Sequence, residues 1–239
     1  MNEMVGILAA KDPDFMIHGL QKLNVFGQEV WLTTTHVSLF IIFAVLITFA
    51  VVVRIKLKDT EGRPGALQNA AEMIVEMLDG MVKQSMGLKG KPYRNYIGVL
   101  FIFLLVSNLS GLLGLRPPTA DYGVTLALGL ITFTIVQFNN IKNNKFGAVT
   151  DLFKPLPFLF PINFIGEIAT PISLSLRLFG NVTAGTVIMG LIYGLLSKVA
   201  LLWPGFLHIY FDIFSGAIQA YVFCMLTMVF VGNKIPDKE

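Results

Sequence analysis

Long uncharged stretches alternate with short polar connections along this chain. The stretches are residues 30–53, 95–115, 122–141, 178–197 and 213–233, and each has 20 residues or more. A helix that rises about 1.5 Å per residue needs about 20 apolar residues to cross roughly 30 Å of hydrocarbon. The pattern therefore predicts five membrane-embedded helices in an all-α integral membrane protein.

A helical pattern of another kind appears between the first two stretches. After Pro64 and Gly65, acidic residues and a lysine alternate with apolar residues at helical spacing. The apolar residues are Leu67, Ala71, Ile74, Met77, Leu78, Met81 and Val82. This pattern predicts an amphipathic surface helix. Its apolar face fits both an interfacial position in the membrane and docking against the other helices, and the sequence leaves both open.

Prolines predict two interruptions of the helical pattern. Pro117 and Pro118 predict a turn between the second and third stretches. Three more prolines interrupt the apolar segment 155–166, at Pro155, Pro157 and Pro161. We expect this segment to be buried but not regularly helical.

The organisation along the chain indicates one unit. No internal repeat or domain boundary is visible, and the polar connections are too short to fold separately. We expect a single membrane domain over residues 1–239. Its expected parts are an N-terminal outer tail (1–29), a cytoplasmic connection with the surface helix (54–94) and a C-terminal helical pair (about 162–233).

Composition agrees with this interpretation. Hydrophobic residues make up 54% of the chain and charged residues only 14%, with a mean hydropathy of +0.70, which is typical of an integral membrane protein. The single cysteine, Cys224, lies inside the last uncharged stretch and has no partner for a disulfide. We therefore expect no disulfide and no metal site.

The distribution of basic residues predicts the orientation. Thirteen lie on one side of the predicted helices: Arg54, Lys56, Lys58, Arg63, Lys83, Lys89, Lys91, Arg94, Lys142, Lys145, Lys154, Lys234 and Lys238. Four lie on the other: Lys11, Lys22, Arg116 and Lys198. Because basic residues concentrate on the cytoplasmic side, we expect the N-terminus outside and the C-terminus in the cytoplasm. Such residues face water and lipid headgroups, so we expect no nucleic-acid partner.

Arg177 is isolated in an apolar environment. No other charge lies between Ile168 and Ser197, and a charge at the bilayer centre costs at least ~2.5 kcal/mol. Such an arginine is usually paired, functional or next to a water-filled cavity rather than merely structural. On a 3.6-residue period it shares a face with polar and small residues, namely Ser173, Asn181, Ala184 and Gly185, and Gly180 lies beside them. Another helix can approach closely there.

The last uncharged stretch continues a second polar pattern. His208, Asp212, Ser215 and Gln219 follow one another at spacings of four, three and four residues. Such a face suits a proton relay, and it also suits hydrogen bonding between helices. Glu167 is a further acid, which lies near the prolines and is either buried or exposed.

The residues around Arg177 resemble the signature of the a subunit of F-type ATP synthase. The matching residues are Arg177, Leu178, Phe179, Gly180, Asn181, Ala184 and Gly185, with Gln219 on the next helix. Residues 108–121, Asn-Leu-Ser-Gly-Leu-Leu-Gly-Leu-Arg-Pro-Pro-Thr-Ala-Asp, also resemble the family's earlier helix and outer loop. The likeness covers essentially the whole chain.

The resemblance implies a stator role in the membrane sector of that enzyme. Arg177 would face the ion-binding carboxylates of a rotor c-ring, with Asn181 and Gln219 close to it, and b-type peripheral stalk subunits would be further partners. The c-ring face would consist of Ser173, Arg177, Asn181, Ala184 and Gly185. The resemblance also implies that the last two helices are long and strongly tilted, which would replace two of the upright crossings.

In such a stator, ions enter by one half-channel, ride the ring and leave by another, while Arg177 separates the two. The expected ion-translocating residues are Arg177, Asn181, Asp212, Gln219, Glu167, His208 and Ser215. Many relatives carry an acid nine positions after the arginine, where this chain has Thr186. We therefore expect Asp212 to be the acid of the outer channel. Whether Glu167 or Thr186 takes part stays open.

The chain is not expected to be an enzyme on its own. It contains no Gly-x-x-x-x-Gly-Lys-Ser/Thr loop for nucleotide phosphates, so we expect no nucleotide site and no cofactor. No signal peptide is evident before the first stretch, and we expect a bacterial cell membrane location. A carrier for a small anion and a non-conducting scaffold are the alternatives. The coupling ion, H⁺ or Na⁺, is left open.

Overall fold

The computed structural model describes residues 19–25, 28–56, 65–144, 157–195 and 203–236. Its α-helices are α2 (Thr34–Lys56), α3 (Ala66–Met86), α4 (Arg94–Leu109), α5 (Tyr122–Asn144), α7 (Phe160–Leu195), α8 (Trp203–His208) and α9 (Gly216–Gly232). The 3-10 turns are η1 (Gly87–Tyr93), η2 (Ser110–Leu113), η3 (Pro118–Ala120) and η5 (Pro157–Leu159). A π-helix, η6 (Ile209–Ser215), joins α8 to α9.

Five stretches of the described chain are long and apolar enough to cross a membrane. They lie in α2, in the segment that ends with α4 and η2, in α5, in α7, and in the segment from α8 through α9. The prediction of five membrane helices in a multi-pass protein is thereby confirmed. Arg177 falls in the middle of α7, because this helix begins well before the uncharged stretch does.

The proline-rich segment before Arg177 differs from the prediction. Helix α7 begins at Phe160, so the segment is regular helix from there on. Pro161 is tolerated because N–H groups in the first helical turn have no partner within the helix. Side chains expected to be buried, such as Phe158 and Ile165, are instead exposed. Residues 155–156 lie outside the described residues.

A β-hairpin precedes the first helix and was not predicted. Strands β1 (Gly19–Val25) and β2 (Gln28–Thr33) pair in antiparallel fashion. The lysine Nζ of Lys22 lies 4.9 Å from the centre of the Trp31 ring, a cation–π contact across the two strands. The first helix therefore begins at Thr34, and residues 30–33 of the first uncharged stretch belong to a strand.

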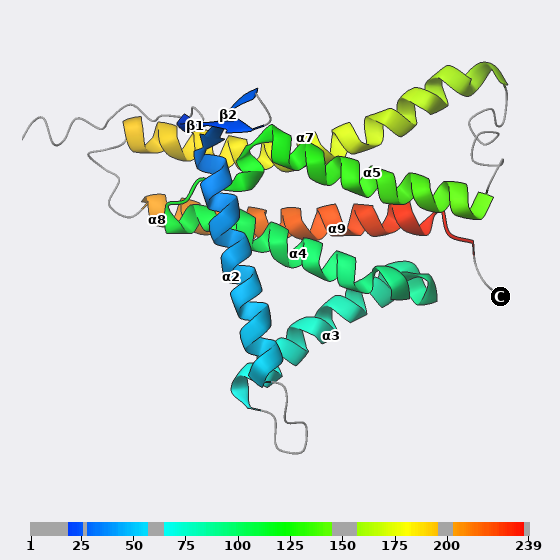
Figure 1. Ribbon diagram of the computed structural model, residues 1–239, viewed down its shortest axis with the longest axis horizontal. Helices are drawn as coiled ribbons and strands as arrows, with labels where there is room; N and C mark the ends of the chain where they lie inside the picture. Colours follow the sequence, from blue (N-terminus) through cyan, green and yellow to red (C-terminus); the bar gives the residue numbers. More distant parts are fainter. Residues whose placement is uncertain (1–18, 26–27, 57–64, 145–156, 196–202, 237–239) are drawn as a thin grey trace, which may run out of the picture.

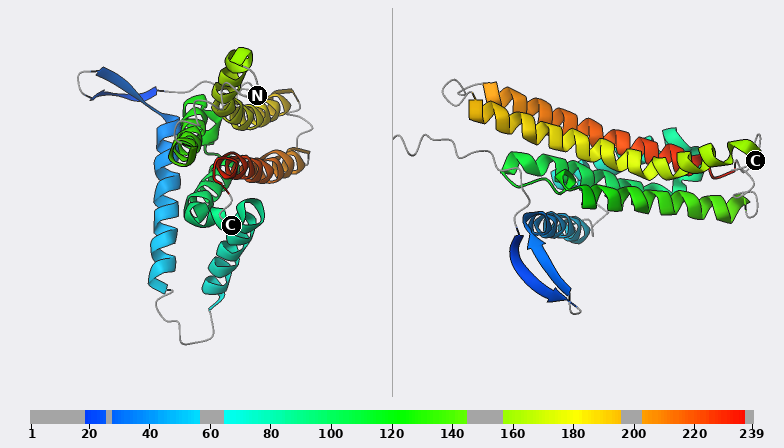
Figure 2. Two further views of the ribbon diagram at one scale, coloured as in Figure 1. Left: turned by 90° about the vertical axis from the view of Figure 1, so that its right-hand side faces the viewer. Right: turned by 90° about the horizontal axis from the view of Figure 1, so that it is seen from above.

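The long helices run in two directions. In Figure 1, α4, α5, α7 and α9 extend roughly side by side, whereas α2 crosses them. The contacts agree with this view, since α5 packs along α7 and α4 packs along α9. In the view from above in Figure 2, α7 also lies beside the α8–α9 segment. This arrangement brings the helix with Arg177 next to the one with Asp212.

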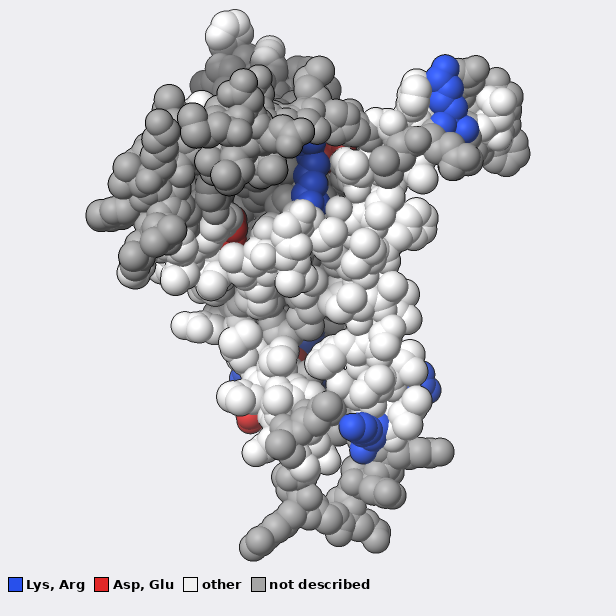
Figure 3. All heavy atoms as spheres, turned by 90° about the vertical axis from the view of Figure 1, so that its left-hand side faces the viewer, with Lys and Arg blue, Asp and Glu red and all other residues white. Residues whose placement is uncertain are grey.

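The outer surface is largely apolar. Uncharged residues cover most of the described surface in Figure 3, and charged side chains are sparse there. Helix α2 in particular exposes large apolar side chains, including Phe40 and Ile47. A soluble protein rarely exposes so much continuous apolar surface, whereas lipid or neighbouring membrane helices would cover it.

The core lies between α4, α5, α7 and α9. Its buried apolar side chains include Leu104 of α4, Val136 of α5, Leu178 of α7, and Phe223 and Met228 of α9. Cys224 is buried in the same core. The four helices therefore form one packed unit, and α7 carries Arg177 on it.

Two glycines allow these helices to approach closely. A Cβ atom at Gly129 of α5 would lie 2.7 Å from the backbone oxygen of Pro171 in α7. One at Gly216 of α9 would lie 3.0 Å from the Cβ of Asn108 in α4. The Asn108 amide also donates to the Gly216 carbonyl at 2.9 Å. Small residues and polar side chains thus join the helices, as is common in membrane bundles.

The amphipathic helix predicted within 54–94 is α3. Its second half docks by Leu78, Val82 and Met86, which are buried where α3 meets α4 and α9. Its first half leaves Met73 and Val75 exposed. Docking against the bundle is therefore observed for the second half, whereas an interfacial position of the first half stays a prediction.

Candidate functional site

Arg177 lies on the exposed face of α7. Among the described residues, its guanidinium has neither a hydrogen-bond nor an ion-pair partner. It lines a small cavity of about 210 Å³ together with Ser173 and Thr170 of the same helix and Leu226 of α9. A permanently charged group is thus presented outward from an apolar helix, which requires a partner or water outside this chain.

The small-residue face predicted around Arg177 is divided in two. Ser173 and Ala184 are exposed on the same side as Arg177. Asn181 and Gly185, predicted for the same face, instead turn toward the last helix. The Asn181 amide nitrogen donates to the Ser215 hydroxyl at 2.9 Å, and this hydroxyl donates to the amide oxygen at 3.1 Å.

Gly185 provides the space that lets α7 approach the last helical segment near the Asn181–Ser215 contact. It is buried, and a Cβ atom there would lie 3.6 Å from the Cβ of Phe211. Gly185 therefore does not lie with Ser173 and Arg177 on the exposed side of α7, although all three were predicted to share a face. Asn181 and Gly185 lie far enough round the helix from Ser173 to contact a different neighbour. Assigning all of these residues to one face of a 3.6-residue period misses this difference.

A cavity of about 400 Å³ lies beyond Asn181. Asp212 and His208 line it from the last helical segment, and Thr183 and Thr186 line it from α7. The imidazole Nδ1 of His208 lies 2.5 Å from the carboxylate Oδ2 of Asp212. We call this space the outer cavity, because the loop with Pro117, predicted to lie outside, also lines it.

The two threonines of the outer cavity differ. The Thr186 hydroxyl donates to the Thr183 carbonyl at 2.9 Å, so it is satisfied within its own helix. The Thr183 hydroxyl is buried and has no hydrogen-bond partner among the described residues. Thr186 and Asp212 line the same cavity, so an acid on either helix would reach the same space.

The π-helix shifts the polar pattern of the last helix. A π-turn holds more residues than an α-turn and is often found at functional sites. Within η6, Asp212 lines the outer cavity, whereas Ser215 turns to Asn181. Gln219 lines none of the cavities around Arg177; it is buried, and its Nε2 has no partner in the described part of the chain. The single polar path predicted from regular spacing is thus split.

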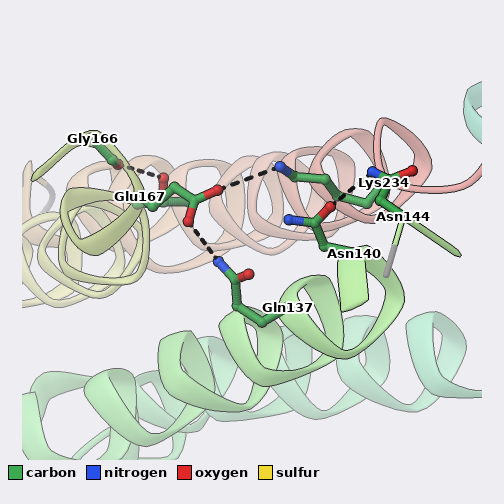
Figure 4. Close-up of polar contacts among 7 residues, drawn as sticks. Gln137, Asn140, Asn144, Gly166, Glu167 and Lys234 are labelled. Atoms are coloured by element: carbon green, nitrogen blue, oxygen red, sulfur yellow. Dashed lines mark hydrogen bonds and ion pairs between the residues drawn. The ribbon is translucent and has the colours of Figure 1, made fainter. Parts of the chain in front are cut away.

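A second cavity, of about 600 Å³, lies on the other side of Arg177. Glu167 of α7 lines it, and both of its carboxylate oxygens are engaged, as Figure 4 shows. Oε1 lies 3.4 Å from the ammonium of Lys234, and Oε2 accepts a hydrogen bond from Gln137 of α5 at 3.2 Å. We call this space the inner cavity, since Lys234 belongs to the end predicted to be cytoplasmic.

The inner cavity contains functional candidates that the sequence analysis missed. Lys234 was counted only as an orientation signal, and Gln137 was not singled out. Gln137 lies close to Asn139 and Asn140 in the third uncharged stretch, and amide side chains in a membrane helix are a signal for buried polar contacts. Of the two positions left open for Glu167, the structure shows a half-buried carboxylate in an ion pair.

The inner cavity continues toward Arg177. It shares four lining residues with the small cavity at Arg177: Gly166, Thr170, Leu174 and Phe230. On the other side, Asn181 lies one helical turn from Arg177 and lines the outer cavity. Arg177 is therefore located between an inner cavity with Glu167 and an outer cavity with Asp212.

Comparison with known proteins identifies the family. Residues 36–232 match the model of the family described as ATP synthase A chain. The chain belongs to this family. It is 39% identical to the ATP synthase subunit a, sodium ion specific, of Propionigenium modestum, over 90% of this chain and 78% of the relative. It is 36% identical to the ATP synthase subunit a of Priestia megaterium, over 72% of this chain and 80% of that protein.

A third relative, the ATP synthase subunit a of Moorella thermoacetica, is 36% identical over 71% of this chain and 77% of its own length. Membership in the ATP synthase A chain family confirms the resemblance seen around Arg177. The chain is thus an ion-conducting stator component of the membrane sector.

Proposed function

We propose that Arg177 separates two half-channels in this ATP synthase A chain family member. The observation that carries the proposal is its position: an exposed guanidinium, without a partner among the described residues, lies between two cavities that are each lined by one described acid. A cation that moved directly from one cavity to the other would meet a permanent positive charge. Ion flow would therefore have to turn the rotor.

The outer half-channel would use Asp212, with His208 orienting its carboxylate and with Asn181 and Ser215 at its inner end. The inner half-channel would use Glu167. Gln219, whose buried amide nitrogen has no partner in the described part of the chain, would bind a water molecule. Thr186 would act only as a hydrogen-bonding wall residue.

The rotor would bind the exposed face of α7. Ser173, Arg177, Gly180 and Ala184 form this face, and a Cβ atom at Gly180 would meet nothing within 4 Å. A c-ring helix could therefore come close to the guanidinium. A rotor carboxylate is neutral when it faces lipid, since an ionised one would bear the full cost of burial, and it ionises when it reaches Arg177.

In this proposal the chain has a non-catalytic role. Torque from the ring would drive nucleotide chemistry in a separate sector, while b-type stalk subunits keep this chain static. The distribution of basic residues supports a C-terminus in the cytoplasm of a bacterial cell, and α7 with α9 would be strongly tilted in the membrane. Either H⁺ or Na⁺ fits, because both cations are repelled by Arg177 and attracted by the two acids.

Single cysteines test the two cavities. In a complex in which Cys224 is replaced by serine, Thr186→Cys should react with a membrane-impermeant thiol reagent only from outside. Thr170→Cys should react only from the cytoplasmic side. Ile47→Cys, on the apolar exposed surface of α2, is the control and should react from neither side. Reaction of both cavity cysteines from the same side would contradict two separate half-channels.

A further inference from the structure

The inner cavity contains a lysine, Lys234, to which the proposed half-channel assigns no role. Glu167 and Lys234 are the two ionisable side chains among the described residues that line it. Their charged atoms lie 3.4 Å apart, and the side chains are 30% and 28% exposed. Gln137 occupies the other carboxylate oxygen. Figure 4 shows the three side chains converging from α7, α5 and the segment after α9.

Lys234 is held at this position by the surrounding helices. Its backbone carbonyl accepts a hydrogen bond from the Asn143 amide of α5 at 2.9 Å. The next carbonyl, that of Ile235, accepts from the Lys89 ammonium of η1 at 2.9 Å. The backbone N–H of Lys234 donates to the Val231 carbonyl of α9 at 3.1 Å. Three elements thus fix the turn that directs this ammonium into the cavity.

We propose that Lys234 is a positioning residue of the inner half-channel: a tethered cation that neutralises Glu167 and competes with the transported cation for it. The proposal rests on the proposed function of the inner cavity. A bare carboxylate in a cavity with low-dielectric walls would concentrate cations. With Lys234 in place, a cation binds Glu167 only if it displaces the ammonium.

This competition has a direction. Ions that leave the ring for the cytoplasm must be released from the inner cavity, and a tethered cation favours release because it reoccupies the carboxylate. The cost falls on ions that enter from the cytoplasm, since they bind more weakly. A purely structural tie of the C-terminal turn would alter assembly or stability and would show no such dependence on the side of entry.

The test measures ion affinity separately from the two sides in vesicles with equal amounts of assembled complex. ATP-driven pumping reports the half-saturating concentration of the coupling ion, H⁺ or Na⁺, on the cytoplasmic side. ATP synthesis reports it on the outer side. For Lys234→Gln we expect the cytoplasmic value to fall about fivefold, as for loss of a partly exposed ion pair, and the outer value to stay unchanged.

Conservative and matched variants sharpen this test. Lys234→Arg retains the charge and should keep the wild-type values on both sides. Lys142→Gln removes an exposed lysine from the last turn of α5 and should change neither. Lys234→Met should shift the cytoplasmic value in the same direction as Lys234→Gln. If neither neutral variant assembles, the lysine is a structural tie and the proposal is overturned.

The double variant separates this proposal from the proposed function. When Glu167 is already replaced by Gln, adding Lys234→Gln should no longer lower the half-saturating ion concentration on the cytoplasmic side. If Lys234→Gln leaves the half-saturating concentrations on both sides unchanged, or shifts both equally, only the role of Lys234 is overturned. If Glu167→Gln by itself leaves cytoplasmic ion entry at the wild-type level, the inner cavity is not the ion route, and the proposed function fails at that point.

Discussion

The two cavities flanking Arg177 hold their acids in different ways. In the outer cavity, Asp212 contacts His208 of the same helical segment, four residues earlier. In the inner cavity, Glu167 is held by Lys234 and Gln137, which belong to two other elements. The outer acid is thus paired within its own helical segment, and the inner acid is held between segments that lie far apart in the chain.

This difference suits opposite tasks. A locally paired acid can bind and release an ion without any rearrangement between helices. An acid held by three elements also joins those elements, so its loss would affect packing as well as conduction. The following variants separate the two cavities, starting with the largest expected effect.

Asp212→Asn should slow ion-driven ATP synthesis at least about tenfold, because it removes a positioned acid from the outer path. Assembly should be unchanged, since Asn has nearly the same shape and the pair with His208 lies within one helical segment. The measurement is the rate of synthesis in vesicles at equal complex content. Asp121→Asn, which alters an acid in the loop between α4 and α5, is the control. Wild-type synthesis in Asp212→Asn would remove Asp212 from the path.

His208→Gln should slow synthesis about fivefold, a smaller effect, because one net hydrogen bond contributes about 1 kcal/mol and Asp212 itself remains. The same vesicle assay measures it. If the loss equals that of Asp212→Asn, the imidazole itself carries the ion, and the outer cavity works as a pair rather than through one acid.

Gly129→Ala should destabilise the complex by about 1–3 kcal/mol, the usual cost of overpacking. The new methyl group would meet the Pro171 carbonyl, which is backbone and cannot rotate away. Thermal unfolding of the purified complex measures the loss. Gly166→Ala, on the same helix as Pro171 with nothing within 4 Å of the new atom, is the matched control. Equal stability of the two variants would show that α5 and α7 can separate without cost.

The sequence predicted the apolar helices, because the helix length needed to cross hydrocarbon is read locally along the chain. It also singled out Arg177, because the cost of a charge among apolar residues is local too. It also placed His208 and Asp212 together, since four residues along a helix bring side chains onto one face. These features need no knowledge of how distant segments pack.

Three features depended on such packing and were missed. The π-helix η6 changed the phase of the last helix, so Gln219 left the path that regular spacing assigned to it. Gly185 turned inward because Phe211 occupies the adjacent space. Lys234 and Glu167 are 67 positions apart in the sequence, and the packing of α7 against α9 brings them together.

The most direct test of the account is ion leak and ATP synthesis in vesicles that contain the wild-type complex, Arg177→Ala or Arg177→Lys at equal assembly. Arg54→Ala, at the exposed end of α2, is the control for loss of an arginine. We expect Arg177→Ala to abolish coupled synthesis and to raise passive ion leak, because the barrier between the cavities is gone. Arg177→Lys should restore synthesis only in part, since an ammonium lacks the planar fork and loses its proton more readily when buried. Wild-type synthesis and unchanged leak in Arg177→Ala would show that Arg177 is structural and would contradict the account.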